Sequence, residues 1–391
     1  MGQTLSEGFS AEEPVAFVSH ESARIACWNL AGQEVERWPV GSSRQFLPSG
    51  CCVTGQRQFG RLAATANLHG IGLDAGPVEL LVPTASSRSR GRRANLHVWR
   101  DAILPGSFLV AERRLLVSSP CFTVLQLGCA RRPTRITQER TRREMEAERE
   151  LRARLGMPEQ GFSMTDLLEW ENIWRLVCLA RTVTEFAGTY LPAVPPSVQV
   201  TFGHPPLATR DEMRAYLAGL LPSSAGIMRA RRAVELGFDR SASPMETALA
   251  LMLSLDVDLG GFGLPRPTLN HPIDVDPLRR DLASQNRMEL DLAWDEVRLT
   301  AEYDGDDHHP VEDAEKAAED NERQNSLVTM GHAVLRVRYP QVVNYSRLAL
   351  LARQIAHILD VELVQPTDLQ MIRRRKLHAA LLVPLVQRYG V

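Results

Sequence analysis

The sequence predicts an α+β protein of more than one domain, in which helices and short strands alternate toward the C-terminus. Segments with apolar residues at helical spacing are interleaved with segments that alternate strictly between polar and apolar residues. A chain of 391 residues is also long enough for two or three hydrophobic cores. We expect an N-terminal α+β domain over 1–130, a mainly helical region over 131–240, an α/β sandwich over 241–363 and a C-terminal helix over 364–391.

Short elements are predicted throughout the N-terminal region. Ser119-Pro120 is typical of a helix start, because serine caps the helix and proline suits its first position. Another helix is predicted from Glu21 to Leu30. The predicted strands are Pro77–Pro83, Leu96–Trp99 and Arg114–Val117.

The middle of the chain is predicted to be helical. Residues 131–155 alternate arginine and glutamate with few apolar anchors, which predicts a solvated connecting helix with i,i+4 ion pairs. Apolar residues at helical spacing follow from Ser163 to Arg181. Thr209-x-x-Glu212 is a capping box that begins another helix, and a further helix is predicted from Gly226 to Leu236.

The C-terminal block has the order helix, strand hairpin, helix, strand, helix, which predicts an α/β sandwich with a mixed central sheet. Around the hairpin, the predicted elements are a helix Pro244–Leu255, a loop or short strand Leu264–Ile273, a helix Val311–Met330, a strand His332–Val337, a helix Ser346–Leu359 and a terminal helix from Thr367.

The hairpin carries the residues with the clearest chemistry. Residues 288–294 and 298–304 both alternate polar and apolar side chains. Pairing them brings Asp291 beside Glu302, with Asp304 two residues further on the same face. Converging carboxylates repel one another, and a divalent cation such as Mg²⁺ or Mn²⁺ would offset the repulsion. The alternative is an ordinary acidic face of an antiparallel pair.

Two further groups are candidates for this site. After Gly305, His308 and His309 provide candidate ligands or proton carriers at the end of the strand, because imidazole titrates near neutrality. Glu246 belongs to the sequence Ser243-x-x-Glu246, which is a capping box in its own right. Both a capping role and a catalytic role stay open for Glu246.

The basic residues are almost all arginines, in a chain with a formal net charge of −2. One group is a candidate contact for a phosphate backbone, although a solvated loop is the alternative; it consists of Arg88, Arg90, Arg92 and Arg93. The run 373–376 has the same two interpretations, as a phosphate contact or a solvated helix face. We expect Arg336 to form a structural ion pair. Arg323 is a candidate contact for nucleic acid, and the alternative is a pair with Asp320 on the same helix.

Composition is that of a globular protein, with 44% apolar and 24% charged residues. No apolar run is long enough for a transmembrane helix, and the first residues lack the features of a signal peptide. The six cysteines form neither a C-x-x-C pair nor a zinc spacing. We therefore expect a protein of the reducing cytoplasm with no membrane partner.

The C-terminal block resembles the very-short-patch-repair-like branch of the PD-(D/E)XK nuclease superfamily, from Ser243 to near Asp360. The resemblance is carried by Asp291-Leu292-Ala293-Trp294, by 299–305 and by Asp320-x-x-Arg323-x-x-x-Leu327-x-x-x-Gly331-His332-x-Val334-Leu335-Arg336. It implies a restriction-endonuclease-like fold and a DNA substrate, with Asp291 and Glu302 as Mg²⁺ ligands. Asp304 stands where the superfamily often has lysine, so His308, His309 or Arg323 would take that role.

The N-terminal region is similar to the strand–strand–helix region of AbiEi-type antitoxin and regulator proteins, on residues 96–100 and 117–127. That similarity implies DNA binding or autoregulation, although Cys121 and Gln126 depart from the pattern. Together the two resemblances favour a Mg²⁺-dependent endonuclease in repair, restriction or defence. The alternative is a non-catalytic, antitoxin-like regulator on a nuclease fold.

Overall fold

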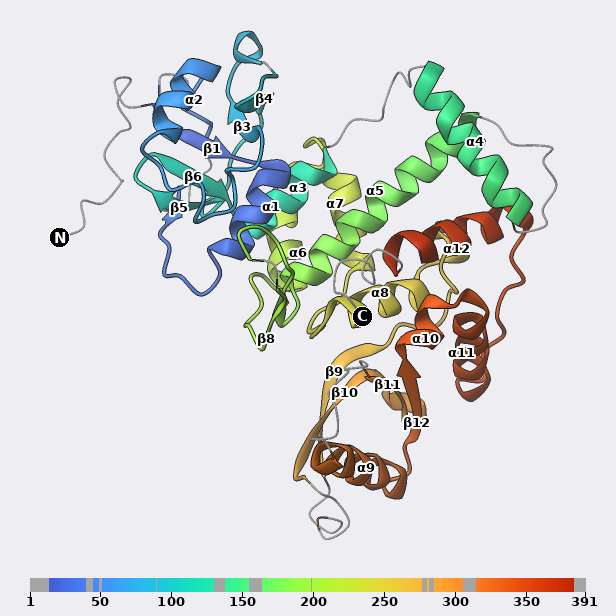
Figure 1. Cartoon of the computed structure of the whole chain (residues 1–391). Coiled ribbons are helices and arrows are strands. Elements are labelled where there is room, and N and C mark those ends of the chain that lie inside the picture. Colours follow the sequence, from blue (N-terminus) through green and yellow to red (C-terminus); the bar gives the residue numbers. More distant parts are fainter. Residues whose placement is uncertain are drawn as a thin grey trace. The chain divides into compact units, whose positions relative to one another are not determined.

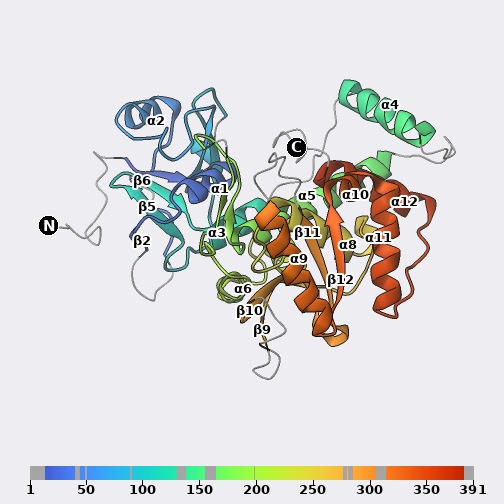
Figure 2. The same cartoon turned by 60° about the horizontal axis from the view of Figure 1, so that its bottom comes forward.

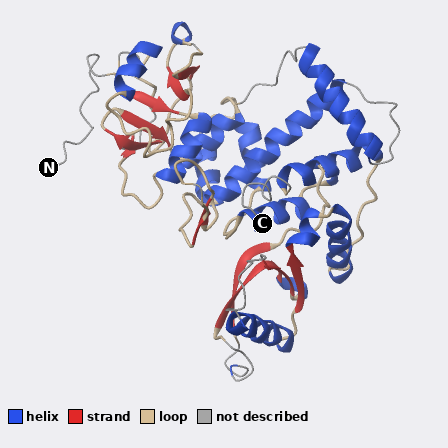
Figure 3. Ribbon diagram, in the orientation of Figure 1, coloured by secondary structure: helices blue, strands red, loops and turns tan. Residues whose placement is uncertain are grey.

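The computed structural model confirms the α+β class (Figures 1 and 3). The residues that the structure describes are 14–39, 45–48, 51–88, 90–129, 138–154, 164–197, 199–275, 280, 285–304 and 314–382. The chain divides into two compact units, each built from two segments. The first comprises Met1–Arg131 and Glu185–Gly237, and the second comprises Arg132–Thr184 and Phe238–Val391. The helical region predicted over 131–240 is thus shared between them.

A mixed six-stranded sheet forms the core of the first unit, in the order β2-β5-β6-β1-β3-β4. The strands are β1 (Ala16–Val18), β2 (Arg37–Trp38), β3 (Val78–Val82), β4 (Ala94–Val98), β5 (Phe108–Glu112) and β6 (Leu115–Ser118). The pairs β1–β6 and β3–β4 are parallel. The predicted strands correspond to β3, β4 and β6, whereas β1 escaped prediction because three buried residues are too few to display a period.

Helices and a small hairpin complete the first unit. They are α1 (His20–Asn29), α2 (Gln56–Ala63), η1 (Ala85–Ser87), α3 (Pro120–Gly128), β7 (Tyr190–Leu191), β8 (Thr201–Phe202), α6 (Arg210–Ala218) and α7 (Ile227–Leu236). Helix α3 contacts α1, α6 and α7. It begins at Pro120 with Ser119 as N-cap, as predicted. The ring of Phe108 in β5 packs against those of Phe17 in β1 and Phe122 in α3, with centroids 5.0 and 5.3 Å apart.

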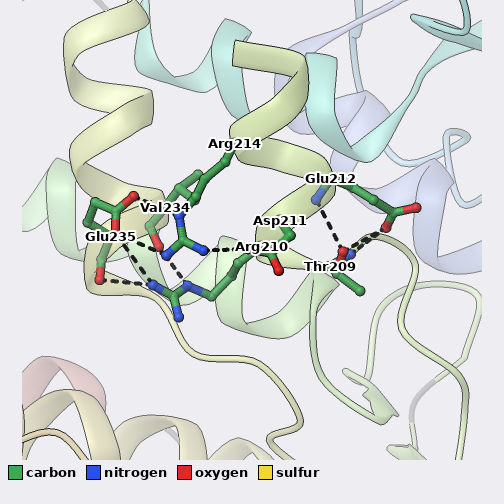
Figure 4. Close-up of polar contacts among 7 residues, drawn as sticks. All are labelled: Thr209, Arg210, Asp211, Glu212, Arg214, Val234 and Glu235. Atoms are coloured by element: carbon green, nitrogen blue, oxygen red, sulfur yellow. Dashed lines mark hydrogen bonds and ion pairs between the residues drawn. The ribbon is translucent and has the colours of Figure 1, made fainter. Parts of the chain in front are cut away.

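Helices α6 and α7 are joined by side-chain contacts (Figure 4). The predicted capping box is present: Thr209 Oγ1 accepts from the Glu212 backbone N–H at 3.2 Å, and Glu212 Oε2 accepts from the Thr209 N–H at 2.7 Å. Arg214 donates to both oxygens of Glu235, at 2.8 and 3.0 Å, and to Asp211 at 2.7 Å. Because these ion pairs are exposed, each stabilises by only ~0–1 kcal/mol.

The second unit contains most of the long helices. They are α4 (Gln138–Arg154), α5 (Met164–Phe186, whose last two residues belong to the first unit), α8 (Pro244–Ser254), η2 (Val257–Leu259), α9 (Ala314–Thr329), α10 (Tyr339–Val343), α11 (Tyr345–Ile358) and α12 (Asp368–Leu381). The helices predicted from Pro244, Val311, Ser346 and Thr367 correspond to α8, α9, α11 and α12. None of the helices in the described part of the chain has both the length and the apolar character needed to cross a membrane.

A four-stranded sheet in the order β12-β11-β10-β9 lies within the second unit. Its strands are β9 (Thr268–Asp274), β10 (Arg287–Trp294), β11 (Leu299–Asp304) and β12 (Ala333–Arg338). The first three are antiparallel neighbours, and β12 runs parallel to β11 after the crossover helix α9. Helix α8 contacts β10, and α9 contacts β12 (Figure 2). Leu327 of α9 belongs to the same buried cluster as Ala293 of β10.

Helix α4 is in part the solvated connecting helix that we predicted. Most of its described side chains are exposed, and the pair Glu150–Arg154 has the expected i,i+4 character. One face is buried instead: Glu148 and Arg152 are 3% and 6% exposed, and Glu148 forms ion pairs with Arg152 and with Lys376 of α12. The buried face was missed because the sequence shows charge alternation but not the second helix against which that face packs.

The basic residues 373–376 of α12 are not a solvated helix face, and their contacts within the unit leave them unavailable to a phosphate backbone. Arg373 forms an ion pair with Glu169 of α5 at 2.5 Å. The buried Arg374 lies 4.6 Å from the ring of Phe262, and Arg375 stacks over Tyr345. These side chains attach α12 to its own unit, because guanidinium groups pair with carboxylates and aromatic faces alike.

Candidate active site

The hairpin β10–β11 brings two acids together as predicted. Leu292 pairs with Ala301 and Ala293 with Thr300, so Asp291 and Glu302 are the next pair in register. The Asp291 backbone N–H donates to Glu302 Oε1 at 3.3 Å. The turn is a short 3₁₀ segment, Asp295–Val297, that closes the hairpin without shifting this register. The two carboxylates therefore lie side by side on one face of the sheet.

This face forms the wall of a cavity of about 110 Å³. Strand β11 contributes Glu302, Tyr303 and Asp304, and β10 contributes Asp291. The remaining lining comes from α9 and β12 and consists of Arg323, Gln324, Leu327, Val334 and Arg336. The cavity is thus bounded by three carboxylates and two guanidinium groups.

Glu302 is the most heavily contacted of the acids. Its Oε1 accepts from the Thr300 hydroxyl at 2.5 Å, and its Oε2 lies 2.7 Å from Nη2 of Arg323. Arg323 also donates to the carbonyl oxygen of Glu289. Arg323, which was predicted to contact nucleic acid, is therefore paired with an acid of the cavity, where its positive charge offsets the negative charge of Glu302.

Asp291 is held in an unfavourable electrostatic setting. Its Oδ2 accepts from the Tyr303 backbone N–H at 2.8 Å. Burial, followed by the neighbouring charges of Glu302 and Glu246, raises the pKa of Asp291 to about 8, although the Tyr303 N–H and Arg323 oppose the shift. The neighbouring groups that the structure describes therefore do not fully offset the negative charge of Asp291 and Glu302. A bound cation would offset the remainder.

Glu246 lies in the first turn of α8 and also approaches the acids. Ser243 is the N-cap, and its Oγ accepts from the Glu246 N–H at 3.1 Å. The Glu246 carboxylate does not bond back to the Ser243 N–H; it accepts from the Ala242 N–H at 2.9 Å and from Asn270 Nδ2 at 2.6 Å. Burial raises the pKa of Glu246 against these hydrogen bonds, and Glu302 adds to the rise. The predicted N-cap is therefore present but the capping box is incomplete, and the catalytic role of Glu246 stays a prediction.

Asp304 does not join the other two carboxylates, which corrects the expected convergence of three acids. It pairs with Arg336 at 3.0 Å and Arg338 at 3.4 Å. Among the described residues of this unit, no three acidic, histidine or cysteine side chains place ligand atoms within 4.8 Å of one another. The cause is β12, because its parallel pairing with β11 places arginines beside Asp304. The ion pair predicted for Arg336 is present.

The remaining predicted site residues are outside the described part of the chain or belong to the first unit. His308 and His309 are outside the described residues, as is the side chain of Asp320. Arg88, Arg90, Arg92 and Arg93 belong to the first unit, where all four are exposed in the segment between β3 and β4. Their exposure agrees with both a solvated loop and a phosphate contact.

Three residues around the acids were not predicted. Thr300 shares the face of Glu302 by strand alternation, so the period of β11 would have indicated it. Asn270 bonds both Glu246 and the carbonyl of Arg240, in a backbone with φ of 44°. Arg338 contacts Asp304 through the register of β12. Neither of these last two carries a local sequence signal, since each depends on how non-adjacent strands pair.

Comparison with known proteins gives no relative: no family model matches the chain, and neither the curated proteins nor the solved structures provide a significant match. The two family resemblances therefore stay predictions, and the geometry of the site carries the functional argument.

Proposed function

We propose that the second unit hydrolyses DNA phosphodiester bonds with a divalent cation, Mg²⁺ or Mn²⁺, held by Asp291 and Glu302. The observation that carries this proposal is the pairing of these two acids in register at the wall of one cavity. The order of helix α8, strands β9 to β11, helix α9 and strand β12 is consistent with the nuclease resemblance.

The residues present fit such a cation. Mg²⁺ and Mn²⁺ prefer carboxylate oxygens, and both acids supply them from rigid strands. The cavity of about 110 Å³ has room for a hydrated ion, because one water needs only ~10–15 Å³ of such space. Bound there, the cation would polarise the phosphoryl oxygen and lower the pKa of a coordinated water.

The chain's own side chains would orient the substrate. Arg323 and Arg336 line the cavity and place positive charge beside the acids, where a phosphate oxygen would otherwise meet only carboxylates. Asp304 keeps Arg336 in this position. When a cation neutralises the Glu302 carboxylate, Arg323 would leave its ion pair with Glu302 and bind a phosphate oxygen instead.

A second function is favoured by the ion pair in which Arg323 already neutralises Glu302. The resemblance adds that Asp304 stands where the nuclease superfamily often has lysine. A protein in which this ion pair replaces the metal would be a non-catalytic, antitoxin-like DNA-binding regulator.

Cleavage of supercoiled plasmid DNA separates the two functions. We expect nicking by the full-length protein with Mg²⁺ or Mn²⁺ and none with a chelator. Asp291→Asn and Glu302→Gln should each reduce the rate at least ~100-fold, because each removes a metal ligand. The matched control is Glu289→Gln on the same strand, whose exposed carboxylate pairs with Arg240 and should leave the rate unchanged.

The outcomes discriminate clearly. Equal residual cleavage by all three variants would contradict the nuclease and indicate a contaminating activity. Absence of cleavage together with DNA binding, measured by fluorescence anisotropy, would favour the regulator.

A further inference from the structure

A second cluster of ligating side chains lies in the first unit, independent of the proposed nuclease site. His20, Glu79 and His97 each place one ligand atom within 4.8 Å of the other two. We propose that these three residues bind a first-row transition-metal dication of the Zn²⁺ type.

The fold brings the three ligands together from separate elements. Strands β3 and β4 pair in parallel, with Glu79 beside Asn95 and Leu81 beside His97, so Glu79 and His97 share one face. His20 is the first residue of α1 and is separated from β1 by Ser19 alone. The Ser19 N–H donates to the carbonyl oxygen of Glu79 at 2.8 Å, which fixes the start of α1 against β3.

The distances suit a shared ion. Glu79 Oε2 lies 3.3 Å from His97 Nε2 and 3.9 Å from His20 Nδ1. Two ligands at ~2.0–2.1 Å from a tetrahedral ion are themselves ~3.3 Å apart, so His97 already has this separation from Glu79 and His20 would reach it by a shift of about 0.6 Å. The two imidazole rings lie side by side, with centroids 4.3 Å apart.

His20 has an unusual backbone conformation. Its φ is 50°, in the left-handed region that a non-glycine residue adopts only at a cost. Its N–H donates to Oε1 of the buried Gln126 at 2.9 Å. Strain of this kind clusters at functional positions, and the imidazole of His20 lies beside Glu79 and His97.

The chemistry of the set selects the metal. Two imidazoles and one carboxylate suit Zn²⁺, Fe²⁺ or Co²⁺ and leave coordination positions open, whereas Mg²⁺ prefers oxygen ligands alone. The three side chains are between 16% and 33% exposed, so an ion and an exchangeable ligand can reach them.

Titration with Zn²⁺, and spectroscopy with Co²⁺ as a probe, test the proposal. The full-length protein carrying Asp291→Asn and Glu302→Gln removes the carboxylate site from the measurement. We expect one equivalent of Zn²⁺ to bind by calorimetry, and Co²⁺ to give the visible bands of a low-coordinate nitrogen–oxygen site. Adding Glu79→Gln or His20→Asn should weaken binding at least ~100-fold. Asparagine tolerates the left-handed backbone at position 20, so that variant keeps the fold.

A matched control is available in the same unit. His69 and Asp74 form an exposed pair, with Nδ1 and Oδ2 2.7 Å apart, which has no third ligand within reach among the described residues. His69→Asn should therefore leave Zn²⁺ affinity unchanged. No stoichiometric Zn²⁺ binding, binding that survives Glu79→Gln with an unchanged circular dichroism spectrum, or a sulfur-to-cobalt charge-transfer band would each overturn the proposal. The last would assign the ion to a cysteine.

Discussion

At the residue scale, Glu302 is the residue on which the candidate active site depends. Its carboxylate accepts hydrogen bonds from a hydroxyl of its own strand and from a backbone N–H of β10, and it forms an ion pair with a guanidinium of α9. These three contacts fix its carboxylate against the cavity. Asp291 is compensated less completely: the Tyr303 N–H and the charge of Arg323 do not offset its burial and the neighbouring acids, so its pKa is still raised.

Asp291→Asn should therefore stabilise the protein in the presence of a chelator. A carboxyl whose pKa is raised to about 8 in the folded state lowers stability as it ionises. The penalty is absent below its ordinary pKa near 4, grows as pH rises and is complete above pH 8. We expect the variant to gain about 1–3 kcal/mol at pH 8 and little at pH 4. Thermal melting across this pH range measures the difference.

With a bound metal ion, we expect the wild-type protein to become more stable than Asp291→Asn. Mn²⁺ should raise the melting temperature of the wild-type protein, because a ligand that binds only the folded state stabilises it. The variant should not respond at this site. A variant that is less stable than wild type at pH 8 in chelator would contradict the electrostatic account of Asp291.

At the element scale, the hairpin was predictable because its signals are local. Strict alternation defines both strands, and a short turn fixes their register, so Asp291 and Glu302 were placed as neighbours from the sequence. Asp304 was misplaced because its partners lie on β12, which reaches β11 only through the crossover helix α9. The ligands of the proposed Zn²⁺ site escaped prediction for the same reason, since three separate elements supply them.

Helix α4 gives a direct test of packing at this scale. The buried Glu148 is the carboxylate partner of Lys376, so Glu148→Gln leaves a largely buried ammonium without that charge. We expect a loss of about 3 kcal/mol in the free energy of unfolding, measured in urea. Glu150→Gln, in the exposed pair with Arg154, should cost less than ~0.5 kcal/mol. Equal effects of the two substitutions would show that α4 does not pack as described.

At the scale of the whole molecule, we propose one cation site among the described residues of each unit. The carboxylate pair of the second unit offers oxygen ligands, and the histidine–glutamate cluster of the first offers mainly nitrogen. The two sites should therefore respond to different metals. A formal net charge of −2 gives no general attraction to nucleic acid, so DNA binding would depend on local arginines such as Arg323 and Arg336.

An anomalous difference map from crystals of the protein grown with Mn²⁺ decides whether Asp291 and Glu302 share one divalent cation. We expect a single peak between the two carboxylates, about 2.1 Å from an oxygen of each. Well-ordered carboxylates with no peak between them at saturating Mn²⁺, or a peak bound by only one of the two acids, would contradict it.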